Sequence, residues 1–140
     1  MVAAPTPAEV TRTPEEGAVT VRATLRLEGF EMRLAASPAR DADLVLWTIH
    51  AVTPIEGYEE CPLAVMVDGQ VTAWRAARTQ RRDLHVPLDL AAVRALAGGQ
   101  SVNGRVCTSP WTLSAEHLLT VRQFLTAFDE ELRWASATAH

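Results

Sequence analysis

The stretch AVTVRATLRLEGFEMRLA, residues 18–35, decides the fold class of this chain. Its first half alternates Val, Ala and Leu with Thr and Arg, and its second half alternates Phe, Met and Leu with Glu and Arg. A period of two is typical of a β-strand with one buried face and one solvated face. Glu28 and Gly29 separate the halves, and Gly29 can take the positive φ that a tight turn requires. We therefore expect an antiparallel hairpin here.

Four further stretches predict the rest of a sheet. LVLWTIHAV (44–52) is apolar nearly throughout, which is typical of a strand covered on both faces. In PLAVMVDGQVTAWRA (62–76), Asp68 and Gly69 separate two β-rich runs and suit a type I′ turn. DLHVPL (83–88) predicts a short strand, and Pro87 places it at a sheet edge or at the strand's end. SVNGRVC (101–107) predicts either one strand or two very short strands joined by a turn at Asn103-Gly104.

Two helices are expected after residue 88. The first spans 89–97, with Asp89 as N-cap, Leu88 and Val93 as a hydrophobic staple, and Gly98 as a left-handed end. The second spans 114–133, begins at the N-cap Ser114, and carries one apolar stripe made of Leu118, Val121, Leu125, Phe128 and Leu132.

The segment GRVCTSPWTLSAEHLL (104–119) contains a Cys, a Trp and a His within sixteen positions. We interpret it as a joint between a strand and the second helix, because Leu113 and Leu118 form another staple around Ser114. Pro110 and Trp111 then occupy the corner before the helix.

These elements predict an α+β fold. We expect a mostly antiparallel β-sandwich or curled sheet of six to seven strands, a long C-terminal amphipathic helix and one short crossover helix. Residues 1–17, which hold three prolines, are interpreted as an extended Pro-rich arm or linker. Residues 18–134 form a single globular domain and 135–140 a tail, because 140 residues suffice for one hydrophobic core.

Charge and hydropathy limit the function classes. The formal net charge of −4 and the isoelectric point of about 5.5 argue against a nucleic-acid partner. No apolar run reaches the roughly 18–20 residues of a membrane-spanning helix, so no membrane insertion is expected. If Met1 is the native start, the absence of a secretory signal predicts a cytoplasmic protein; a trimmed start would fit a periplasmic or extracellular one. All 13 basic residues are Arg, which indicates a GC-rich, bacterial genome.

The two cysteines, Cys61 and Cys107, stand at the ends of expected strands. In the cytosol they would be reduced and buried, whereas in an oxidising compartment they would form a disulfide. Neither belongs to a CxxC pair, so the sequence predicts no metal site at the cysteines.

Histidines stand at positions 50, 85, 117 and 140, without the spacing of a zinc site. We interpret them as helix-surface or half-buried residues. The chain also lacks a P-loop and a GxSxG elbow, so we expect no catalytic, cofactor-binding or metal residues. An enzymatic reading would instead need a polar cavity that holds His50 or His85 beside a carboxylate.

The candidate interaction patch consists of two charged segments and two tryptophans. Within EGYEECP (56–62) and WRAARTQRRD (74–83), the acidic segment 56–60 and the basic segment 74–82 are interpreted as loops that flank the strand 63–67. The course of these loops can place them toward opposite ends of that strand. Opposite charges in this arrangement suit a protein partner or another copy. The patch residues are Glu56, Glu59, Glu60, Trp74, Arg75, Arg78, Arg81, Arg82 and Trp134.

The sequence therefore predicts a non-catalytic protein-interaction or structural subunit of a bacterial assembly, or a homo-oligomer. The alternative is a small-ligand-binding or enzymatic domain with a pocket between the sheet and the C-terminal helix.

Overall fold

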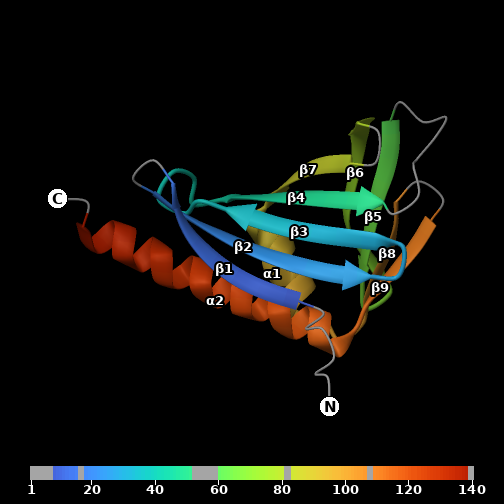
Figure 1. Cartoon of the computed structure of the whole chain (residues 1–140). Coiled ribbons are helices and arrows are strands. Elements are labelled where there is room, and N and C mark those ends of the chain that lie inside the picture. The colour runs from blue at the N-terminus through green and yellow to red at the C-terminus, as the bar shows by residue number, and fades with distance from the viewer. Residues whose placement is uncertain (1–7, 16–17, 52–59, 81–82, 107–108, 139–140) are drawn as a thin grey trace, which may run out of the picture.

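The computed structural model describes residues 8–15, 18–51, 60–80, 83–106 and 109–138. Within these ranges the chain is α+β, as predicted, with nine strands and two helices (Figure 1). The strands are β1 (Ala8–Glu15), β2 (Ala18–Leu27), β3 (Phe30–Ala36), β4 (Leu44–Ala51), β5 (Glu60–Val67), β6 (Gln70–Gln80), β7 (Asp83–Asp89), β8 (Val102–Val106) and β9 (Ser109–Leu113). The helices are α1 (Leu90–Gly98) and α2 (Ala115–Thr138).

The strands pair antiparallel in the order β1-β2-β3-β4-β7-β6-β5-β8-β9. They form two sheets: the first sheet is β1-β2-β3-β4-β7 and the second sheet is β6-β5-β8-β9. The sheets are joined only where Thr79 and Gln80 of β6 pair with the start of β7. Figure 1 shows the second sheet turned across one end of the first. Beyond Leu84, β7 therefore pairs with β4 alone, and Pro87 lies on a strand edge, as its missing N–H predicted.

Both predicted hairpin turns are confirmed by their backbone angles. Gly29 joins β2 to β3 with a φ of 82°. Asp68 and Gly69 join β5 to β6 with φ values of 51° and 83°, and two successive positive φ values define the type I′ turn. The Asp68 carboxylate also accepts hydrogen bonds from the backbone N–H groups of Gln100 and Ser101 at 3.0 and 2.9 Å, so this turn is tied to the start of β8.

Helices α1 and α2 cover one face of the first sheet, which we call its inner face (Figure 1). The predicted stripe of α2 is buried from Leu118 to Phe128 and partly buried at Leu132. Phe124, which the stripe omitted, is fully buried beside it. Neither of the described helices is long and apolar enough to cross a bilayer.

Ion pairs attach the later part of α2 to its neighbours. Arg12 of β1 pairs with Glu130 and Glu131, and its hydrogen bond to Glu130 raises the pKa of the guanidinium. Arg94 of α1 contacts Asp129 at 2.6 Å, and this hydrogen bond raises the pKa of Arg94. Both pairs are solvent-exposed, so they orient α2 more than they stabilise it.

The strand count corrects the expectation of six to seven. One additional strand, β1, lies within the segment interpreted as a free arm, and the other, β9, contains Pro110 and Trp111 from the expected corner. These two strands are the outermost of the nine. An outermost strand leaves one backbone edge unpaired, so it tolerates Pro14 and Pro110 where an inner strand would lose a hydrogen bond.

Asn103-Gly104 lies inside β8, which confirms the first of the two alternatives for this segment, a single strand. Three other expectations change. Helix α2 continues past residue 133 to Thr138. Gly98 has no positive φ; instead, a Cβ on the neighbouring Gly99 would meet the Val67 side chain at 2.4 Å. Strand β4 is covered on one face only, as the next subsection describes.

Candidate functional site

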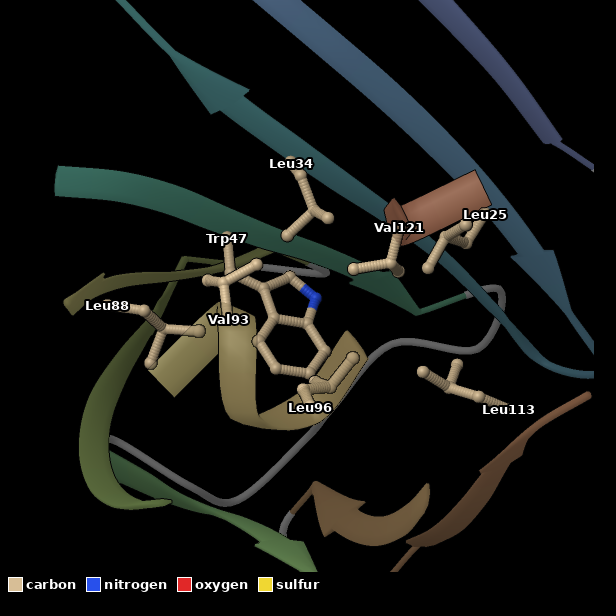
Figure 2. A pocket seen from close by; sticks show the side chains of 8 residues that line it. All are labelled: Leu25, Leu34, Trp47, Leu88, Val93, Leu96, Leu113 and Val121. Carbon is tan, nitrogen blue, oxygen red and sulfur yellow. The ribbon is translucent and has the colours of Figure 1, made fainter. Parts of the chain in front are cut away.

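Among the described residues, apolar side chains pack between the first sheet and the helices. A cavity of about 10 Å³ lies among them, which is about the size of one water molecule (Figure 2). Figure 2 shows the Trp47 side chain among the lining residues, and its indole nitrogen is buried without a hydrogen-bond partner. The lining residues are Leu25, Leu34, Trp47, Leu88, Val93, Leu96, Leu113 and Val121. The structure thus provides no room for a substrate at this position.

His117 is buried at the start of α2, where it has a structural role. Its Nδ1 accepts the backbone N–H of Ser114 at 3.0 Å, and the Ser114 hydroxyl accepts the N–H of His117 at 3.2 Å. This reciprocal pair is a capping box in which His replaces the usual Glu. Because Nδ1 is an acceptor, the proton resides on Nε2, which donates to the Arg26 carbonyl at 2.8 Å. His117 therefore joins α2 to the end of β2.

The register of β4 and β7 brings His50 and His85 to one face of the first sheet. His50 pairs with Asp83 across the strands, and His85 pairs with Thr48. His50 Nδ1 lies 2.6 Å from an Asp83 carboxylate oxygen, and His85 Nδ1 lies 3.1 Å from the Thr48 hydroxyl. An oriented His–Asp pair is a component of acid–base sites. Here it lies on the face opposite the helices, and its two side chains are 43% and 42% exposed.

No group of three or more His, Cys, Asp or Glu side chains in the described part of the chain could hold a metal ion. His50, His85 and Asp83 therefore do not form a metal centre with the geometry seen here.

We call the surface of the first sheet opposite the helices its outer face. Leu44 and Leu46 of β4 are each 40% exposed on it. The register places Leu46 between Ala35 of β3 and Pro87 of β7, which makes an apolar row across three strands. The sequence analysis expected β4 to be covered on both faces. Leu44 and Leu46 on the outer face and Val45 on the inner face are all aliphatic, so the start of the strand shows no alternation of apolar and polar residues.

A usable signal was nevertheless present in β4. Thr48 and His50 share the outer face with Leu44 and Leu46, because side chains two apart point the same way along a strand. Polar residues on every second position thus indicated one solvated face.

A second row on the outer face consists of charged residues that are paired across neighbouring strands. It lies further along the strands than the apolar row, with Arg33, Thr48 and His85 between the two rows. Arg26 of β2 pairs with Glu31 of β3, Glu31 with His50, and His50 with Asp83. Glu31 also accepts a hydrogen bond from Arg33 at 2.8 Å on its own strand. The outer face therefore combines exposed aliphatic side chains with ordered charges.

The charged segments of the predicted patch are arranged differently from expectation. Residues 74–80 belong to strand β6 and are not a loop. The register pairs Glu60 with Arg78 and Ala64 with Trp74, so the acidic and basic segments meet at the same end of β5 instead of opposite ends. Arg75 lies opposite Leu63 in the same ladder.

Several predicted patch residues lie outside the described residues, namely Glu56, Glu59, Arg81 and Arg82. Trp134 lies on α2 and is 67% exposed. Cys61 lies in β5, but Cys107 is outside the described residues, so their disulfide stays a prediction.

Comparisons with protein families, with curated proteins and with solved structures found no match for this chain.

Proposed function

We propose that this chain is a non-catalytic protein-interaction subunit that binds its partner through the outer face of the first sheet. The observation that carries the proposal is the apolar packing between the first sheet and the helices in the described part of the chain, where the cavity lined by Trp47 measures about 10 Å³ and has an apolar lining. Ligand sites are ordinarily clefts of roughly 300–1,000 Å³ with convergent polar groups. The alternative function, a ligand pocket between sheet and helix, therefore has little support.

The composition of the outer face favours a protein partner. Leu44 and Leu46 offer exposed aliphatic surface, with Asp89 opposite Leu44 and the polar row Arg33, Thr48 and His85 on the other side of Leu46. The charged row of Glu31, His50 and Asp83 follows one row further along the strands. An apolar centre with a charged rim is the usual anatomy of a protein interface. Trp134 and the segments 56–60 and 74–82 remain candidates for additional contacts. Trp134 belongs to the helix layer, so a partner on the outer face would leave it accessible.

Site-specific photo-crosslinking in the cells that produce the chain tests this proposal. A photoreactive side chain in place of Leu46 should give a protein adduct, because this position lies at the centre of the proposed contact. The same group in place of Glu116, which is exposed at the start of α2 on the helix side, is the matched control and should give none. A folded Leu46 variant that yields no protein adduct at native abundance would contradict the proposal.

A further inference from the structure

We propose that the outer face of the first sheet binds a second copy of this chain, face to face, about a two-fold axis parallel to the strands. The inference rests on the proposed function and names the partner. The axis runs between β3 and β4, at the middle of the four strands β2, β3, β4 and β7.

The charges on this face are complementary to themselves. One row crosses the four strands in the order Arg26, Glu31, His50, Asp83. From β2 to β7 its members are a cation, an anion, an imidazole that can donate a hydrogen bond, and an anion. The proposed two-fold axis reverses the order of the row in the second copy. Arg26 then faces Asp83 of the second copy, and Glu31 faces His50 of the second copy.

Each of these contacts occurs twice, because in an isologous interface residue i contacts residue j and residue j contacts residue i. The contact between His50 and Asp83 within each chain leaves Asp83 able to bind Arg26 of the second copy, because a carboxylate can accept more than two hydrogen bonds. Asp83 can hold His50 of its own chain at 2.6 Å and still receive Arg26 of the second copy.

The apolar row is matched by the same operation. Reading from β2 to β7, this row is Arg22, Ala35, Leu46 and Pro87. Reversal places Ala35 against Leu46 of the second copy, so a small side chain opposes a larger one on both sides of the axis. Such alternation lets two sheet faces interdigitate. One axis therefore satisfies the charged row and the apolar row together.

The area of the outer face limits how tightly two copies of the chain can associate. Four strands about 4.8 Å apart and about 20 Å long present several hundred Å² per copy. This lies at or below the lower end of specific interfaces, about 600 Å² per partner. We therefore expect a reversible dimer with a dissociation constant on the order of 100 μM, weakened by salt.

Charge reversal tests the two-fold pairing directly. In Arg26→Asp both repeated contacts oppose two carboxylates, and in Asp83→Arg both oppose two guanidinium groups. Each variant alone should raise the dissociation constant by about tenfold or more in sedimentation equilibrium at low salt. The double variant, and an equimolar mixture of the two single variants, should both associate again, because every contact is once more of opposite charge. Arg105→Asp, with the same change of charge on the second sheet, should associate as wild type does.

Thermal denaturation of each variant shows that it is folded before its association is scored. Recovery in both the double variant and the mixture supports the dimer, because only reciprocal contacts between Arg26 and Asp83 produce it. A wild type that stays monomeric at millimolar concentration, or single variants that associate equally well, would overturn it. If the purified protein is monomeric while the Leu46 crosslinker captures a different protein in cells, the dimer is wrong and the proposed function stands. If neither occurs, both fail.

Discussion

Gly104 offers the sharpest test of how the second sheet is packed, through the substitution Gly104→Ala. Gly104 lies inside β8, paired with Val65 of β5 and with Trp111 of β9. A Cβ at this position would lie 2.1 Å from the Ala64 carbonyl oxygen and 2.4 Å from Cζ2 of Trp111. Real Cβ atoms essentially never approach other atoms this closely, so the added methyl must displace backbone or ring.

Neither neighbour can move cheaply. The Ala64 carbonyl belongs to the β5 backbone, which pairs with both β6 and β8. Trp111 is buried and packs edge-to-face on Trp47 with ring centroids 5.7 Å apart, so its displacement would reach the core of the first sheet. Overpacking of this kind costs about 1–3 kcal/mol or more, against a gain of about 0.5–1 kcal/mol for replacing Gly by Ala inside a strand. Because both overlaps are severe and one is with backbone, the overpacking cost lies toward the upper end of its range, about 3 kcal/mol, which leaves a net loss of about 2 kcal/mol.

Urea denaturation followed by far-UV circular dichroism measures this loss as a midpoint lowered by about 1 M, for a slope of about 2 kcal/mol per M. Gly98→Ala is the matched control. Gly98 has no positive φ and nothing within 4 Å of an added Cβ, so Ala should leave the midpoint unchanged or raise it slightly. Equal midpoints for Gly104→Ala and wild type would show that the ring of Trp111 does not pack on Gly104.

Three further predictions concern the helix and the cysteines. Leu125→Ala and Phe128→Ala should each lower the free energy of unfolding by about 2–5 kcal/mol, and unchanged urea midpoints for both would place the stripe of α2 at the surface. The ¹⁵N spectrum of His117 should show the proton on Nε2 and none on Nδ1, and a proton on Nδ1 would contradict the capping box. If the chain is exported, Cys61 and Cys107 should be bonded, with a loop of about 46 residues contributing roughly 4 kcal/mol. Intact mass before and after reduction measures this, and thiols that alkylate without reductant would exclude it.

The sequence pattern predicted those elements whose structure depends on residues close together in the chain. The period of two in residues 18–35 predicted β2 and β3, and the dipeptide Asp68-Gly69 predicted its turn, because these signals depend on neighbours in sequence. The stripe of α2 was equally readable from its spacing of three and four. Strands β1 and β9 were missed because their prolines indicate breaks, whereas an outermost strand tolerates a proline on its unpaired edge.

The outer face could not be assembled from the sequence, because it depends on which strands become neighbours. His50 and Asp83 are 33 positions apart and meet only because β4 pairs with β7 across the β5-β6 hairpin. Each residue alone is an ordinary polar residue on a solvated strand face. Their order in a row across four strands is a property of strand order and register, and a shift of one residue would turn every side chain to the other face.

Pro87 shows how a local signal and a long-range cause combine at this surface. Its missing N–H indicated a strand edge, and β7 does lose its second neighbour beyond Leu84, where β6 leaves the first sheet for the second. Because β6 departs there, the outer face is bounded beyond Leu84 by Pro87 and Asp89 of β7, whereas Asp83 still has Gln80 of β6 beside it. Asp83 lies across the face from the Arg side chains of β2 because of the register of β2, β3, β4 and β7. The charge order used by the proposed dimer follows from that register.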